Sequence, residues 1–200
     1  MQVVGPTLTL RYATAADVPA LFELGSDPEV TRFFSWGPYT SPAEPAAYVE
    51  RLPAARARGE RLEFVIVREQ RPIGVTGLSE LSHRDRRAVV GTWFGRAHWG
   101  TGANAEAKSL IARLAFGALA LERLGAYTDV DNPRSQAALT RIGFTREGIL
   151  RRWHRHGEHT HDVILYSLLE YEFARSPLAT VPVALSGEPP PSFSSGAAPS

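Results

Sequence analysis

The chain has 200 residues, of which 44% are apolar and 22% are charged, and its formal net charge is +1 at pH 7. This composition predicts one soluble domain, and the weak net charge gives no reason to expect a nucleic acid or an acidic membrane as a partner. The sequence has no cysteine, which excludes disulfides, zinc–thiolate sites and a cysteine-linked intermediate. No apolar run approaches the roughly 20 residues that span a bilayer, and MQVVGPTLTL lacks the basic n-region of a signal peptide. We therefore expect a cytoplasmic location and no membrane partner.

The first half of the sequence predicts one strand, two helices and a three-stranded meander. Residues 8–12 alternate in polarity like a strand, and helices are predicted for residues 14–24 and 41–59. Proline at position 53 should end or kink the second helix. Three strand-like runs follow, in an order typical of antiparallel pairing, at residues 62–69, 72–81 and 87–95.

The second half alternates helices with strands until the composition changes. A long helix is predicted for residues 105–124, since its apolar side chains recur at helical spacing and Gly125 would end it. The elements predicted after it are strand 126–131, helix 132–143, and strands 144–153 and 162–173. The whole order predicts a mixed α/β domain over residues 1–175. Residues 176–200 are rich in Pro, Ser and Gly and are expected to form a disordered tail.

The stretch HWGTGANAEAK, residues 98–108, places Gly100 and Gly102 at the start of the long helix. Glycine lets the backbone approach a ligand, and a helix N-terminus offers free N–H groups, so the turn suits a phosphate or diphosphate. A P-loop is excluded, because Ala103 and Asn104 stand where it needs lysine and Ser or Thr. A dinucleotide fingerprint is formally met through Ala105, but a meander precedes it instead of a parallel βαβ unit. An ordinary glycine turn capped by Asn104 stays open as an alternative.

Several stretches together resemble the GNAT family of acyl-CoA-dependent N-acetyltransferases, and within it the RimJ/RimL-like branch that acetylates protein N-termini. The resemblance runs from about Leu8 to Leu169, and its motifs are PIGVTGLSEL, VVGTWFGRAHWGTGANAEAK, VDNPRSQAALTRIGFTREGILRRW and DVILYSLL. It implies the GNAT fold, in which a central, mostly antiparallel, splayed sheet is flanked by helices on both faces. A bulge near Trp93 and Phe94 would open the sheet.

The same resemblance implies that acetyl-CoA is the cosubstrate and that no metal is required. The residues implied to bind the cofactor are Trp93, Phe94, Trp99, Gly100, Thr101, Gly102, Ala103, Asn104, Ala105, Asn132 and Ser135. The family's turn usually begins with Arg or Gln and ends with Gly or Ala, whereas this chain has Trp99 and Asn104 there. Because main-chain N–H groups would hold the diphosphate, these departures should change affinity without abolishing binding.

Acyl transfer from a thioester to an amine needs a neutral amine and a proton for the departing thiolate. Many members of the family supply that proton from a tyrosine, where this chain has Leu139. The resemblance gives the role of acid to Ser135, although its position is also typical of the first turn of a helix capped by Asn132. It gives the role of base to Glu147, for which the alternative is an exposed glutamate at the end of a strand, paired with Arg146 or Arg151.

Four histidines occur in WHRHGEHTH. If Gly157 and Glu158 form a two-residue turn, His156 faces His159 and His154 faces His161, and all four lie on one face of a hairpin. Such a group could bind zinc or nickel or titrate together. A solvated loop is the favoured interpretation, because no carboxylate or cysteine completes a recognised metal motif. The resemblance implies that this loop lies over the acceptor pocket.

These observations predict an enzyme that moves an acetyl group from acetyl-CoA directly to an amine in a ternary complex. A protein N-terminal α-amine is the first choice of acceptor, by resemblance, and a small-molecule amine such as an antibiotic or polyamine is the second. A sensor that binds acyl-CoA without turnover and, more remotely, a Rossmann-type oxidoreductase stay open. So does a homodimer.

Overall fold

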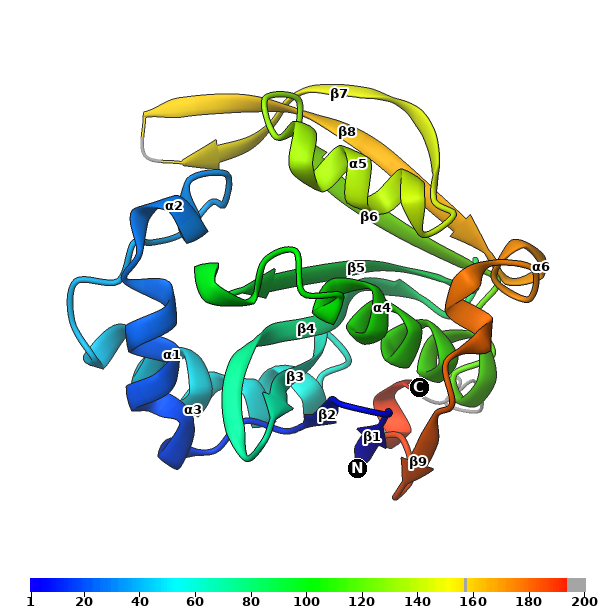
Figure 1. Ribbon diagram of the computed structural model, residues 1–200, viewed down its shortest axis with the longest axis horizontal. Coiled ribbons are helices and arrows are strands. Elements are labelled where there is room, and N and C mark those ends of the chain that lie inside the picture. The colour runs from blue at the N-terminus through cyan, green and yellow to red at the C-terminus, as the bar shows by residue number, and fades with distance from the viewer. Residues whose placement is uncertain (157, 194–200) are drawn as a thin grey trace.

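The computed structural model describes residues 1–156 and 158–193 (Figure 1). Within them, nine strands form one sheet in the order β7-β8-β6-β5-β4-β3-β2-β1-β9. Neighbouring strands are antiparallel except β5 and β6, which are parallel. The strands are β1 (Gln2–Val4), β2 (Thr9–Arg11), β3 (Arg61–Arg68), β4 (Arg71–Ser82), β5 (Arg87–Phe94), β6 (Arg123–Asp129), β7 (Thr145–His156), β8 (His159–Leu169) and β9 (Ala184–Ser186). The expected mixed α/β fold with a mostly antiparallel sheet is confirmed.

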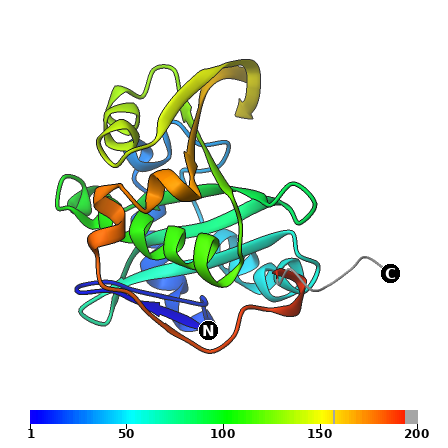
Figure 2. The ribbon, with the colours of Figure 1, turned by 90° about the vertical axis from the view of Figure 1, so that its right-hand side faces the viewer.

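Helices cover both faces of this sheet, as expected (Figures 1 and 2). They are α1 (Val18–Gly25), α2 (Pro28–Thr31), α3 (Ala43–Ala57), α4 (Ala103–Arg113), α5 (Pro133–Arg141) and α6 (Glu170–Phe173). The larger core contains α4, α5 and one face of the sheet, and a smaller core joins α1 and α3 to the other face. None of the helices in the described ranges is long and apolar enough to cross a membrane.

Two helices end at places that differ from the sequence-based expectation. Helix α3 continues through Pro53 to Ala57, because Leu52 and Ala55 are buried against the sheet and tertiary packing outweighs the lost hydrogen bond. The long helix changes to a π-helical turn at Leu114–Ala118, and Gly125 does not end it. That glycine lies inside β6.

The parallel pair β5 and β6 separates after three residue pairs. Arg87 pairs with Arg123, and the last pair is Val89 with Gly125. Beyond it, residues 90–94 pair only with β4 and residues 126–129 only with β8, so the two strands diverge (Figure 1). Main-chain groups on the facing edges of this gap therefore have no strand partner among the described residues and can bind a ligand. The carbonyls of Gly91 and Phe94 are exceptions, because they accept hydrogen bonds from Thr76 Oγ1 and Trp99 Nε1.

The opening does not come from the bulge that was expected near Trp93 and Phe94. Both residues pair regularly with β4, opposite Val75 and Gly74. The register shift lies instead between Ser79 and Ser82, where Glu80 adopts a left-handed φ of 51°. The gap arises because β6 stays with β8 while β5 stays with β4.

The C-terminal segment also differs from the expectation of a disordered tail. Strand β9 pairs with β1 at the edge of the sheet, so the first and the last strand of the described chain lie side by side (Figure 1). Leu178 and Phe193 are buried, and Ser109 Oγ donates a 2.5 Å hydrogen bond to the Leu178 carbonyl. Apolar side chains of this Pro-rich stretch are buried in the core, and the composition of the stretch does not predict this burial. Residues 194–200 lie outside the described residues.

Candidate active site

The turn before α4 leaves a row of main-chain donors free. Gly100 and Gly102 have φ of 73° and 86°, values that glycine adopts at no steric cost, and Gly102 caps the helix. Within the described chain, no acceptor binds the N–H groups of residues 100–105. A Cβ added at either glycine would meet nothing within 4 Å. The turn therefore offers an open anion site at the positive end of a helix dipole.

Arginine side chains from elsewhere approach this turn. The guanidinium of Arg134, in the first turn of α5, lies 3.3 Å from the centre of the Trp99 ring. Arg68, at the end of β3, donates a 3.4 Å hydrogen bond to Thr101 Oγ1. Trp99 occupies the place where the family usually has Arg or Gln, and stacking with Trp99 brings a cation to the same turn from another helix. The departure at Trp99 is thus accompanied by a compensating charge.

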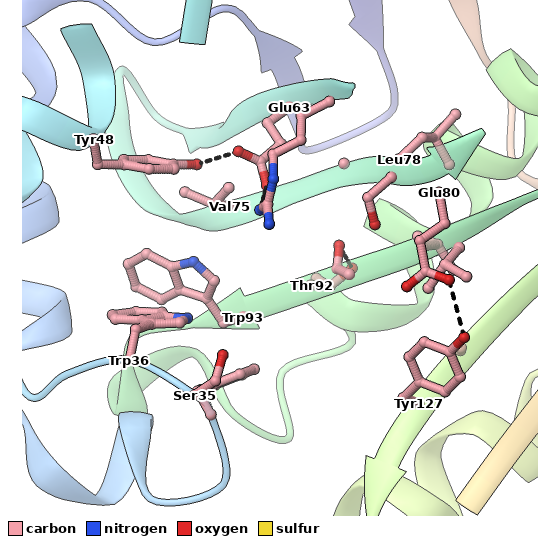
Figure 3. A pocket seen from close by; sticks show the side chains of 18 of the residues that line it. Ser35, Trp36, Tyr48, Glu63, Val75, Leu78, Glu80, Thr92, Trp93 and Tyr127 are labelled. Atoms are coloured by element: carbon pink, nitrogen blue, oxygen red, sulfur yellow. Dashed lines mark hydrogen bonds and ion pairs between the residues drawn. The ribbon is translucent and has the colours of Figure 1, made fainter. Parts of the chain in front are cut away.

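A cavity of about 1020 Å³ runs through the gap between β5 and β6. On the side of α4 and α5 it is lined by Asn104, Lys108, Asn132, Ser135 and Leu139. On the opposite side it is lined by the loop from Phe33 to Tyr39 and by α3. Figure 3 shows this second side, with Trp36 against Trp93 and with Glu80 reaching Tyr127. A ligand entering beside α4 and a ligand entering beside α3 can therefore meet in the gap.

Four of the residues implied to bind the cofactor line this cavity: Trp93, Asn104, Asn132 and Ser135. Thr101 and Gly102 line a separate hollow with Arg68 and Glu106. The remaining five do not line the cavity, and among them Phe94 and Ala103 are buried in the larger core. Asn104 lies inside α4 and does not cap it.

The start of α5 is built as the sequence indicated. Asn132 is the N-cap, and its Oδ1 accepts a 3.1 Å hydrogen bond from the N–H of Ser135. Pro133 is the first helical residue, a position where its missing N–H costs nothing. The cap fixes Ser135 on the cavity wall, beside the buried side chain of Leu139.

Glu147 is not brought to the cavity. Its carboxylate pairs with both Nη atoms of Arg123 and accepts a 2.8 Å hydrogen bond from Ser167 Oγ. The hydrogen bond from Arg123 lowers the pKa of Glu147, so the group stays ionised and bound. Arg123 belongs to the closed end of the β5–β6 pair, away from the gap. Glu147 is thus ion-paired, as the alternative expected, but its partner is Arg123 and not Arg146 or Arg151.

A second cluster of titratable side chains lies in the gap. Tyr127 donates a 3.1 Å hydrogen bond to Glu80 (Figure 3), and burial raises the pKa of Tyr127 to about 12. The His154 ring packs edge-on against Tyr127, with centroids 5.9 Å apart. Burial lowers the pKa of His154, so this imidazole is neutral near pH 7 and can accept a proton. His154 lines the cavity, whereas Glu147, to which the resemblance gives the role of base, does not.

The histidine hairpin has the predicted register. His154 pairs with His161, and His156 pairs with His159. The side chains nevertheless have separate partners: His161 Nδ1 lies 3.0 Å from buried Asp129, and His156 Nε2 lies 3.1 Å from the Gly37 carbonyl. No group of three or more metal-binding side chains occurs in residues 1–156 and 158–193. The proposed turn itself includes Gly157, which lies outside the described residues.

Comparison with known proteins agrees with this architecture. Residues 7–145 match the acetyltransferase (GNAT) domain. The chain is 31% identical to the uncharacterised N-acetyltransferase p20 of Bacillus licheniformis, over 84% of this chain and 95% of that protein. It is 29% identical to the ribosomal-protein-serine acetyltransferase of Escherichia coli K12, over 55% and 62% of the two chains. A crystal structure from T. thermophilus, provisionally assigned as an acetyltransferase, superposes with a TM-score of 0.76 at 31% identity, covering 87% and 94%.

The fold and the open gap, together with these relatives, define an acetyl-CoA-dependent acyltransferase. The glycine turn has the free donors and the open space that a diphosphate needs, and the unpaired strand edges suit the cofactor's arm. The chain belongs to the GNAT family of acetyltransferases.

Glu80, Tyr127 and Lys108 are among the residues of the cavity that were not singled out from the sequence. Glu80 turns into the gap because of the bulge in β4, for which the sequence gives no local signal. The sequence does contain a local signal for Lys108. This residue precedes Ile111 by three positions and Ala115 by seven, so helical spacing places it on the buried face of α4.

Proposed function

We propose that this enzyme transfers the acetyl group of acetyl-CoA directly to the N-terminal α-amine of a protein, in the manner of the RimJ/RimL-like branch. The observation that carries the proposal is the single cavity that joins the two faces of the sheet through the gap. In this arrangement the main-chain N–H groups of residues 100–105 bind the cofactor diphosphate. Asn132 and Ser135 contact its arm from the start of α5, and the acceptor approaches from the side of Trp36 and Trp93.

The groups available in the gap suit an α-amine better than a lysine or polyamine nitrogen. A neutral His154 is a modest base, and an α-ammonium group with a pKa near 8 gives up its proton far more readily than a lysine ammonium near 10.4. The edges of β5 and β6 beyond Val89 and Gly125 also have unpaired main-chain groups, which can hydrogen-bond to an extended peptide. Similarity to an enzyme named for a ribosomal-protein acceptor supports the same choice.

In this proposal His154 accepts a proton from the attacking amine, and Tyr127 and Glu80 hold its ring in place. The His154→Gln variant is expected to lower kcat by about 10²-fold, a usual contribution of a positioned base. Wild-type activity should fall below pH 6.5 as the imidazole becomes protonated. Steady-state rates from pH 5.5 to 8.5 measure both effects.

Glu147→Gln is the matched control for that variant. It removes one negative charge from the same strand, but the carboxylate it alters is bound by Arg123 and Ser167 outside the cavity. We expect kcat to be unchanged and the free energy of unfolding to fall by about 1 kcal/mol or less, as for other exposed ion pairs. A large loss of kcat in Glu147→Gln with full activity in His154→Gln would return the role of base to Glu147.

The acceptor is tested by thiol release from acetyl-CoA across matched amines. The panel contains short peptides with free N-termini, the same peptides with blocked N-termini and one internal lysine, a polyamine and an aminoglycoside. We expect thiol release only with the peptides that have free N-termini. Release with the polyamine or aminoglycoside alone would establish the small-molecule alternative, and none with any amine would favour an acyl-CoA sensor.

A further inference from the structure

Lys108 is the only lysine in the chain, among 22 lysine and arginine residues. The two cations are not interchangeable, because arginine keeps its proton in proteins whereas a buried lysine can lose one. Lys108 is therefore the one side chain among these 22 cations that can release a proton.

The position of Lys108 is set by α4. Its side chain is only 5% exposed and lines the cavity on the α4 side. It follows Ala103, the first residue of the helix, by five positions, which places it about 7.5 Å along the helix axis from the glycine turn. A ligand arm that starts at the turn and enters the gap passes this side chain.

Among the described residues, the Lys108 side chain has one hydrogen-bond partner. Its Nζ donates a 2.6 Å hydrogen bond to Thr92 Oγ1, and that hydroxyl lies 2.7 Å from Thr76 Oγ1. Thr92 is on the part of β5 that has separated from β6. No ion pair of the described residues involves Lys108. A charged amine with two unused N–H donors and no counterion is costly to bury, so packing alone does not explain its presence.

We propose that Lys108 is the proton donor to the coenzyme A sulfur as the acetyl group leaves. The proposal rests on acetyl-CoA as the donor substrate and not on the identity of the acceptor. Leu139 stands where many relatives have the tyrosine that does this work, and Lys108 reaches the same cavity wall from the neighbouring helix.

Atoms and charges balance in this step. The amine nitrogen forms a bond to the carbonyl carbon, and the carbon–sulfur bond breaks with its electron pair staying on sulfur. One proton passes from the Lys108 ammonium to sulfur, which gives the free thiol. The proton lost by the attacking nitrogen goes to His154 and then to solvent, and Lys108 takes up a proton from solvent before the next turnover.

Burial lowers the pKa of Lys108 to about 7. Transfer from such an ammonium to a thiolate whose acid has a pKa of about 8.5 is downhill, whereas a serine hydroxyl is a far weaker acid than either. The charge that develops on sulfur in turn favours the ammonium form. In this proposal Ser135 is not the acid, and its role is to form a hydrogen bond with the cofactor's arm.

Burial alone accounts for this pKa, although other titratable groups face the same cavity. Those on the strands at the gap are already engaged: Glu80 with Tyr127, Asp129 with His161, and His154 with the Tyr127 ring. The remaining charged groups of the cavity wall lie on or beside α3 and β3, against the opposite face of the sheet, and are Glu44, Arg51, Arg58, Glu60, Arg61 and Glu63.

Because the chain has one lysine, selective isotope labelling of lysine gives a single side-chain NMR signal whose titration can be followed directly. We expect a midpoint near pH 7 in the free protein. Bound coenzyme A places its sulfur beside Lys108 Nζ, so the chemical shift of this signal should change on binding, and desulfo-coenzyme A, which lacks the sulfur, should not cause the same change. An unchanged signal with coenzyme A, or the same change with both ligands, would overturn the proposal whatever the acceptor is.

The kinetic test uses Lys108→Met, Lys108→Arg and Ser135→Ala. Lys108→Met is expected to lower kcat by about 10²-fold with little change in KM for acetyl-CoA. Lys108→Arg should not restore the rate, because its proton is not released. Ser135→Ala should cost less than Lys108→Met. Full kcat in Lys108→Met that still binds desulfo-coenzyme A, or a larger loss in Ser135→Ala, contradicts the assignment.

Discussion

Replacing Gly102 by valine is expected to prevent saturation by acetyl-CoA while the protein stays folded. At φ 86° a β-branched residue is strained by about 1–2 kcal/mol, and its side chain projects into the open space beside the free N–H groups. Loss of two hydrogen bonds to charged phosphate oxygens, each worth about 1.5 kcal/mol, weakens binding by about 100-fold. Calorimetry with coenzyme A and the KM for acetyl-CoA measure the effect.

Gly187→Val is the control for backbone strain. Gly187 also has a left-handed φ, 78°, but it follows β9 and does not line the cavity. Both variants should lose stability, and only Gly102→Val should lose the cofactor. Equal coenzyme A affinity in the two variants would show that the glycine turn is not the diphosphate site.

Lys108→Met is expected to make the protein more stable while it removes activity. The pKa of Lys108 is about 7 in the folded chain and about 10.4 in an unfolded one. Between these values the unfolded state holds a proton that the folded state does not, so burial of the lysine opposes folding. At 1.36 kcal/mol for each pH unit, the free energy of unfolding at pH 7 should rise by up to about 4 kcal/mol in the methionine variant.

The pH dependence gives the sign of this effect. The difference in the free energy of unfolding between the variant and the wild-type protein should become smaller as the pH rises from 7 towards 10. The reason is that the cost of releasing the proton disappears above the pKa of lysine in the unfolded chain. Denaturant unfolding of both proteins at pH 7, 8 and 9 measures the difference. A methionine variant that is less stable at pH 7 would mean that Lys108 is a structural residue. A gain in stability with a loss of rate is the pattern of a group kept for function.

Local sequence signals determined much of this protein. Alternation and helical spacing gave the meander, the long helix and the mixed α/β class, because these patterns follow from which side chains face a core. Glycines at 100 and 102 indicated the open turn before α4, and Asn132 with Pro133 indicated the start of α5, since turns and caps depend on adjacent residues. The register of the histidine hairpin followed from the same kind of rule.

The tertiary structure decided what depends on residues far apart in the chain. It paired Glu147 with Arg123 and brought His154 to the gap, because the separation of β6 from β5 fixes which side chains meet there. It also placed the C-terminal segment against β1 and the core, where a few apolar residues outweigh a Pro-rich composition. Lys108 illustrates both the local sequence signal and the contribution of the tertiary structure. Its spacing predicts a buried position, but only the packing of α4 over Thr92 leaves it without a counterion beside the gap.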